Sequence, residues 1–365
     1  MSTSFESFRL LRVPYSVQEI TNHFVEYCLQ NHILARGLCR IGYIQRCKPI
    51  LQLSSESSNA VEKTTSNPTT LLRGLVANKN IPKDTNVVML PLSACIGPSN
   101  VVKCASFFNV FPCEEREKYF YQAASVQNSR VAEKSLIRHN QLFLALYITY
   151  LLLVRALKPD ALREIPGSYA INYLDFLPRS EGNFAELETC MVITLETVEA
   201  CRIGQTCLAT HFNIPQAEIR PLLVWALCMI YSRMVPIDER GLLEEAFRDT
   251  PAAHMFAGTT QALRQISAGT NNANHTSTDS NNDNSGPASG SALVTEPISF
   301  LCPVIDMCNH GDKENVAVMV PDAAPRRVVC LRTLRNVAQG EELIMTYSQS
   351  PAELRTIWGM SQVLV

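Results

Sequence analysis

The order of apolar and polar positions along the chain predicts strands near both ends and helices between them. Val17 to Asn31 carries apolar side chains at helical spacing and predicts an amphipathic helix. Two short apolar runs, 71–77 and 87–91, flank a polar turn containing Pro and Asp and predict a β-hairpin. From about Cys113 to Phe256 the pattern is helical, with expected helices at Glu114 to Ala124, Ser135 to Leu157, Leu187 to Phe212 and Gln216 to Met234 and a loop around Tyr169 to Arg179.

The strongest apolar run extends from Leu142 to Val154. A helix that crosses a membrane needs about 20 apolar residues, and this run is shorter. We therefore expect a buried helix here and no association with a membrane.

The composition changes abruptly after the helical region. Residues 258–290 are dominated by Asn, Ser, Thr, Gly and Ala, which cannot bury enough apolar area to offset the entropy of ordering, so they predict a disordered insertion. Strand patterns follow it at Ile298 to Ile305, Val316 to Val320, Arg327 to Leu334 and Glu342 to Tyr347. Because short strands at both ends surround a helical middle, we expect an α+β fold in which the terminal strands meet.

Composition and charge narrow the function classes. Of the 365 residues 46% are hydrophobic and the net charge is -2, so a globular protein is expected and nucleic-acid binding is not. The chain has 13 cysteines, an odd number, and no two of them are separated by two residues, the spacing of a zinc knuckle. The sequence also shows no secretory signal peptide. We therefore expect reduced cysteines, no metal and an intracellular location, cytoplasmic or nuclear.

Four pieces of the chain, in the same order, resemble the SET domain, in the branch typified by the RuBisCO large-subunit methyltransferase. The pieces are Arg73–Ala77 with Ile81–Asp84 and Pro91, Tyr173–Pro178, Trp225–Ala226 with Ser232–Arg233, and Asp306–His310 with Gly340–Leu343 and Tyr347. The last piece is the most specific, since an Asn-His pair followed about thirty residues later by G-E-E-L-x-x-x-Y is rare by chance. The resemblance extends over about Leu71 to Met360.

This resemblance implies a SET fold, built of short β-strands with a pseudoknot and interrupted by a helical insertion. The implied organisation is an N-terminal helical and loop segment at 1–70 and a SET domain at 71–360, with the helical insertion at about 105–256 and the disordered, low-complexity insertion at about 258–295. The family's C-terminal substrate-binding domain is expected to be absent.

The resemblance also implies S-adenosylmethionine as the cofactor, with no metal in the reaction. Tyr347 matches the family's catalytic tyrosine at the centre of methyl transfer. The implied cofactor-binding residues are Leu71, Leu72 and Arg73 through their backbone, Arg233 through an ion pair with the cofactor carboxylate, Asp306, Met307, Cys308, Asn309 and His310 as one wall, and Trp358 near the adenine.

By the same resemblance, the expected activity is protein-lysine N-methylation of a non-histone protein by a monomer. Two alternatives stay open. The branch includes protein-histidine methyltransferases, which these motifs do not separate from lysine methyltransferases. A catalytically inactive SET-fold interaction module is the other alternative, because Leu72 and Ser348 stand where the family has glycine and because the family's C-terminal domain is expected to be absent.

Overall fold

The chain forms two compact units, one from Met1–Phe24 and Ile96–Leu301 and the other from Val25–Cys95 and Cys302–Val365. We call them the first and the second unit. The computed structural model describes residues 10, 13–33, 35, 37–47, 69–97, 101, 104–111, 130–165, 168, 170–178, 201–237, 298–320 and 328–348. The expected helix at 114–124 and the low-complexity insertion lie outside these residues.

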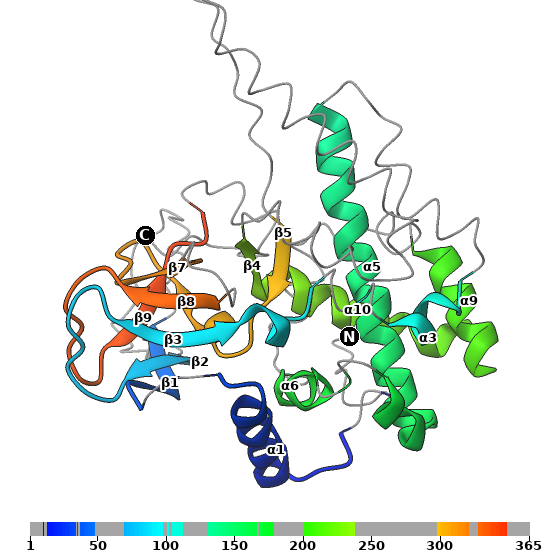
Figure 1. Ribbon diagram of the computed structural model, residues 1–365, viewed down its shortest axis with the longest axis horizontal. Helices are drawn as coiled ribbons and strands as arrows, with labels where there is room; N and C mark the ends of the chain where they lie inside the picture. The colour runs from blue at the N-terminus through cyan, green and yellow to red at the C-terminus, as the bar shows by residue number, and fades with distance from the viewer. Residues whose placement is uncertain are drawn as a thin grey trace, which may run out of the picture. The chain divides into compact units, whose positions relative to one another are not determined.

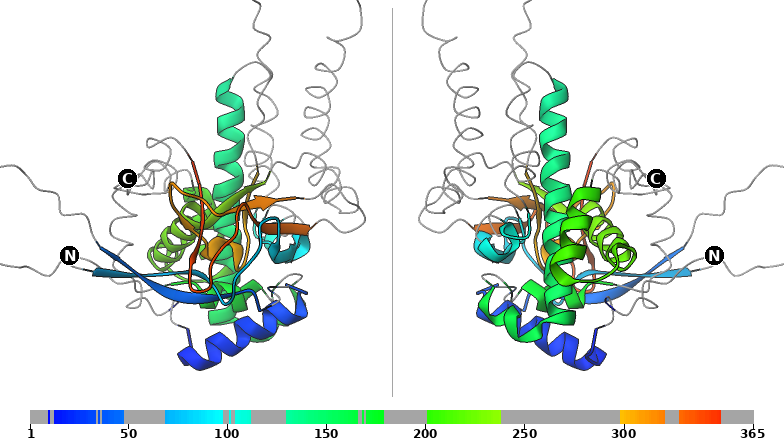
Figure 2. Two further views of the ribbon diagram at one scale, coloured as in Figure 1. Left: turned by 90° about the vertical axis from the view of Figure 1, so that its left-hand side faces the viewer. Right: turned by 90° about the vertical axis from the view of Figure 1, so that its right-hand side faces the viewer.

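Three helices, α5 (Arg130–Leu157), α9 (Arg202–Phe212) and α10 (Gln216–Arg233), pack against one another in the first unit, and Figure 2 shows them side by side. The run Leu142–Val154 is buried along its whole length, which confirms the prediction of a buried helix. Among the described helices, none combines the length and the apolar character that crossing a membrane requires.

A short helix, α6 (Ala170–Phe176), occupies the segment for which the sequence predicts a loop. Its Tyr173 and Leu174 are fully buried, and Phe176 stacks on Phe24 with ring centroids 4.2 Å apart. The loop prediction is wrong because α6 has only seven residues, too few for a clear helical period, and polar and proline residues follow it directly. Shorter elements of this unit are α3 (Ala105–Phe108), η4 (Pro159–Glu164) and an antiparallel pair of strands, β4 (Met234–Ile237) and β5 (Ile298–Leu301).

The second unit holds two sheets of short strands (Figure 1). One has the order β1-β2-β9-β6, from Cys39–Cys47, Thr69–Ala77, Glu342–Met345 and Asn309–His310, and the other has the order β3-β8-β7, from Asn86–Pro91, Val328–Thr333 and Val316–Met319. This unit also contains two 3-10 turns. The turn η3 (Leu92–Ala94) follows β3, and the turn η6 (Ile305–Met307) precedes β6. Helix α1 (Val17–Gln30) forms as predicted and continues across the boundary between the units. The α+β prediction is confirmed.

The predicted β-hairpin between the runs 71–77 and 87–91 does not form. Both runs are strands, but β2 pairs with β1 and β9 whereas β3 pairs with β8. The turn between them instead lies along a distant segment, because Ile81 and Val337 exchange two backbone hydrogen bonds of 2.8 Å. Long-range partners therefore replaced the local pairing that a short polar turn favours.

An ion pair between Arg155 and Asp175 is buried in the first unit. Arg155 of α5 donates a hydrogen bond to Asp175 of α6, and only 8% and 5% of the two side chains are exposed. Removal of one partner from such a pair leaves an uncompensated buried charge. We expect Asp175→Ala to lower the free energy of unfolding by about 3–5 kcal/mol in a denaturant titration.

Asp160→Ala is the matched control, because Asp160 is exposed in η4 and its removal should change stability by less than about 0.5 kcal/mol. The double variant Arg155→Met, Asp175→Leu should recover most of the loss, since it leaves no buried charge. Equal stability of Asp175→Ala and the control would contradict the assignment.

Candidate functional site

The site is organised by the meeting of two segments that are far apart in the sequence. Strand β6 pairs in parallel with β9, so that Asn309 lies opposite Ile344 and His310 opposite Met345. The pairing continues one residue further, where the Gly311 N–H donates to the Met345 carbonyl at 3.2 Å. This pairing joins Asp306–His310 to Gly340–Tyr347, and it agrees with the expectation that strands from distant parts of the chain meet.

The side chain of Asn309, in β6, is held by two other strands of the sheet. Its amide nitrogen donates to the Arg73 carbonyl of β2 at 3.3 Å and to Oε1 of Glu342 in β9 at 2.9 Å. Both neighbours are acceptors, so the nitrogen must face them, and the amide oxygen points away from them. A Cβ atom at the buried Gly74 would lie 2.5 Å from that nitrogen. Glycine at position 74 therefore permits the close approach of Asn309 to β2.

Tyr347 is fixed by both its backbone and its hydroxyl. Its N–H donates to Nδ1 of His310 at 3.1 Å, and its hydroxyl donates to the Cys308 carbonyl at 2.6 Å. The two rings lie 5.3 Å apart. Nδ1 can accept this bond only when it carries no proton, so the contact selects the His310 form with Nδ1 unprotonated. Tyr347 is half-buried and lies two residues after the end of β9.

The residues just before β6 are buried. Asp306, Met307 and Cys308 are each at most 4% exposed. Burial raises the pKa of the Cys308 thiol well above its ordinary value, and this thiol donates to the Leu343 carbonyl at 3.0 Å. Cys308 is therefore an inert packing residue next to β9 rather than a nucleophile.

The structure gathers some of the predicted site residues and not others. Arg73, Asp306–His310 and Tyr347 all belong to the second unit and meet around β6 and β9. The backbones of Leu71 and Leu72 lie further along β2, opposite β1. Arg233 is the last residue of α10 in the first unit, and Trp358 lies outside the described residues.

Asn315 is a site-forming residue that the sequence reasoning missed. It is completely buried, and its side chain accepts the Ile344 N–H at 2.8 Å while donating to the Glu342 carbonyl at 2.8 Å and to Oε1 of Glu341 at 3.0 Å. Its backbone N–H donates to the Ile344 carbonyl at 2.9 Å. In the sequence it stands in a polar run typical of a surface turn, so no local signal marks it as buried.

Glu341 is part of the same clamp on β9. Partial desolvation opposes ionisation of its carboxyl, but hydrogen bonds from Arg335, the Ala338 N–H and Asn315 outweigh it and hold the pKa below its ordinary value. The Arg335 contact is 2.6 Å and the Ala338 contact 2.9 Å. The turn before β9 is therefore tied down by a charged carboxylate.

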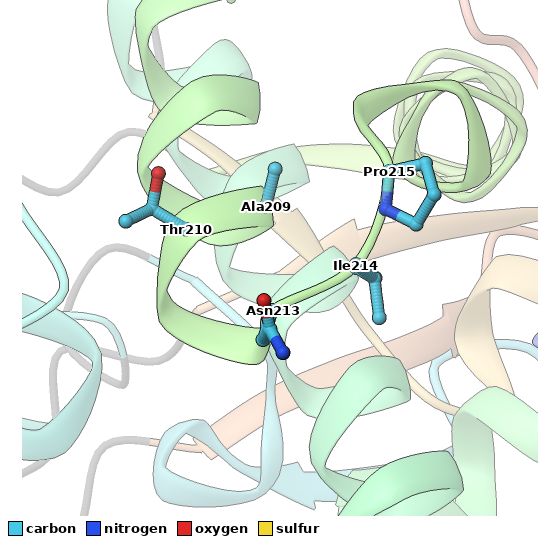
Figure 3. Close-up of a pocket in the computed structure, with 5 residues that line it drawn as sticks. All are labelled: Ala209, Thr210, Asn213, Ile214 and Pro215. Carbon is cyan, nitrogen blue, oxygen red and sulfur yellow. The ribbon is translucent and has the colours of Figure 1, made fainter.

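A pocket in the first unit does not coincide with these residues. It is lined by the end of α9 and the loop before α10, namely Ala209, Thr210, Asn213, Ile214 and Pro215 (Figure 3). Its lining carries no ionisable side chain, and Thr210, Asn213 and Pro215 are exposed, so it offers no chemistry of its own. Within the described part of the chain, no group of three or more His, Cys, Asp or Glu side chains could hold a metal ion.

Comparison with protein families matches the SET domain to residues 72–348. This match covers well over half of the 365 residues, so the chain belongs to the SET-domain family. The family resemblance deduced from the four sequence pieces is confirmed. A search of curated proteins finds no match.

Solved structures similar to the chain include the SET domain of LSMT bound to lysine and AdoHcy, with 14% identity and a TM-score of 0.45. Rubisco LSMT bound to AdoMet is similar at 13% identity and a TM-score of 0.44. These alignments cover 94% of this chain but only 58% and 56% of the other two, so the chain spans less than two thirds of their length.

The clamp formed by Asn315 can be tested by replacement. Asn315→Ala removes the buried side chain that pairs with the Ile344 N–H and the Glu342 carbonyl, two backbone groups of half-buried residues, at a cost of about 1–3 kcal/mol for each group left unpaired. We expect a loss of at least about 2 kcal/mol in the free energy of unfolding, measured by denaturant titration.

Asn336→Ala is the control, because Asn336 is exposed and its side-chain oxygen accepts the Lys83 N–H. Its removal should have a much smaller effect. If the two variants are equally stable, Asn315 does not hold β9.

Proposed function

We propose that the chain is an S-adenosylmethionine-dependent protein-lysine N-methyltransferase that acts on a non-histone protein. Membership of the SET-domain family supports the methyltransferase class and the cofactor. The observation that carries the proposal is the contact of β6 with β9, which brings the phenol of Tyr347 onto the carbonyl of Cys308, the residue directly before the carboxamide-bearing Asn309.

The chain's own residues fit such a cofactor. S-adenosylmethionine carries an ammonium, a carboxylate and an adenine, which neutral amides and backbone groups can recognise by hydrogen bonds. Asn309 is half-buried, and the orientation of its carboxamide is fixed by Arg73 and Glu342, so its oxygen is presented without loss of rotamer entropy on binding. Gly74 provides the space that this arrangement needs. We infer that Asn309 and the backbone of Arg73 and of Asp306–His310 hold the cofactor.

The bound cofactor would supply a methyl group on a sulfonium for in-line transfer to an amine. Tyr347 contributes orientation. Its hydroxyl donates its one proton to the Cys308 carbonyl, so towards an amine it acts as an acceptor. An amine N–H that points at this oxygen directs the nitrogen lone pair elsewhere, and in a closed site this fixes the line of attack. A lysine amine has an ordinary pKa of about 10.4 and must lose a proton before it attacks.

Transfer of labelled methyl groups from S-adenosylmethionine into a cell lysate, followed by mass spectrometry, tests the proposal as a whole. Methylated lysine in a protein other than a histone is the expected product. Methylated histidine would overturn the lysine assignment and keep the class of enzyme. Absence of any transferred label, together with absence of cofactor binding, would establish an inactive SET fold.

Cofactor binding gives a sharper test of Asn309. We expect the wild-type protein to bind S-adenosylmethionine in calorimetry and Asn309→Ala to weaken the affinity by about 10-fold or more, since a preoriented hydrogen bond is lost. Asn80→Ala serves as control, because Asn80 is exposed and accepts only the Gln339 N–H. Equal affinities of the two variants would exclude Asn309 from the site.

The role of Tyr347 predicts a separation of binding from turnover. Tyr347→Phe keeps the ring and its contact with His310 but removes the hydroxyl. We expect kcat to fall by roughly 10²-fold, the usual scale for loss of one orienting hydrogen bond in an active site, while cofactor affinity changes by less than about threefold. Unchanged turnover with the same products would show that Tyr347 is not catalytic.

A further inference from the structure

Two cysteines of the second unit stand opposite each other at the end of an antiparallel pairing. Ile96 and Leu301 exchange both of their backbone hydrogen bonds, each 2.9 Å long. Cys95 and Cys302 are the next residues on the two segments, and Cys95 has extended backbone angles of φ -76° and ψ 148°. They therefore take the place of a non-hydrogen-bonded antiparallel pair, in which the Cα atoms lie about 4.5 Å apart.

This placement suits a disulfide. The two sulfur atoms are 3.6 Å apart, and the side chains are buried, with 1% and 0% exposed. Disulfides span Cα separations of about 4.4–6.8 Å, which includes the spacing of such a pair. At this spacing, rotation of the two side chains is enough to bring the sulfur atoms to bonding distance, and the backbone does not have to move.

We propose that Cys95 and Cys302 form a thiol-oxidation site that closes to a reversible disulfide within the second unit. With hydrogen peroxide as oxidant, one thiol is oxidised to a sulfenic acid and one water is released. The sulfur of the second cysteine then attacks the sulfenic sulfur, the S–S bond forms, and the hydroxyl leaves with the second thiol's proton as another water. Two thiols lose two electrons and the peroxide gains them.

Burial sets the character of this site. It raises the pKa of Cys302 well above the ordinary value for a thiol, so thiolate is scarce near neutral pH and the first oxidation is slow. The same burial shields the product from reducing thiols. The pair is therefore suited to hold a long-lived link rather than to respond quickly.

The link would act on the segment that leads to the candidate site. The Cys302 carbonyl accepts the Asp306 N–H at 2.9 Å, so Cys302 opens the turn that continues into η6 and β6. A disulfide to Cys95 ties the start of this turn to the residue after η3 and restricts the unfolded chain, which stabilises the fold. This inference does not depend on methyl transfer.

The full chain can be oxidised while folded, with hydrogen peroxide, then alkylated and digested with trypsin without reduction. Cys95 is the one cysteine of the tryptic peptide 84–103, whereas peptide 265–313 holds Cys302 and Cys308. We expect these two peptides joined through Cys95 and Cys302, two hydrogen atoms lighter than their sum, with fragmentation placing the link at Cys302. Dithiothreitol should abolish the species.

The matched variants are Cys302→Ala and Cys330→Ala, since Cys330 is also a buried thiol of the second unit. Oxidation should raise the melting temperature of the wild-type protein and of Cys330→Ala by several degrees and should not raise that of Cys302→Ala. Cys95→Ala repeats the test if Cys302→Ala does not fold. The proposal is overturned if peroxide oxidises other cysteines while Cys95 and Cys302 stay open to alkylation after unfolding, or if the link is at Cys308.

Discussion

The contact between β6 and β9 is the constraint on which the candidate site depends. β6 has only two residues and β9 only four, and strands of this length have no stability of their own. β9 is held by β2 on one edge and β6 on the other, and Asn315 binds both the N–H and the carbonyl of Ile344. The side chains of Asn309 and Tyr347 are oriented only when all of these partners are in place.

The polar groups around β9 behave as a unit. Asn315 is buried completely, and its amide satisfies three partners at once, while Glu341 is tied to Arg335 and to the turn before the strand. In a low-dielectric surrounding, a fully satisfied network of this kind is rigid, whereas one with a missing member leaves costly buried groups. The register of β9, and with it the position of Tyr347, is therefore specified by hydrogen bonds as well as by apolar packing.

The sequence predicted what is encoded locally. The helices α1, α5 and α10 and the strands β5, β7, β8 and β9 follow from apolar spacing within each segment, and the Asn-His and G-E-E-L motifs pointed to the two segments that meet in the candidate site. The hairpin prediction failed because β2 pairs with β1 and with β9, and β3 pairs with β8, and both β8 and β9 lie more than two hundred residues away. Asn315 escaped notice for a related reason, since its burial is created by segments that its neighbours in the sequence do not reveal. β1 was missed because it carries Arg, Gly and Gln between its apolar residues and gains its order from β2.

Two buried cysteines of the second unit, Cys302 and Cys308, differ in their neighbours rather than in their acidity. Cys302 and Cys308 lie six residues apart, are both completely buried, and have pKa values raised well above the ordinary thiol range by burial. Cys308 donates to a backbone carbonyl of β9 and so completes the wall of the candidate cofactor site. Cys302 faces the sulfur of Cys95 instead. Because burial raises the pKa of both thiols, acidity does not distinguish them, and the neighbouring group decides the chemistry of each. A backbone carbonyl fixes the Cys308 thiol in place, whereas a second thiol gives Cys302 a partner for oxidation.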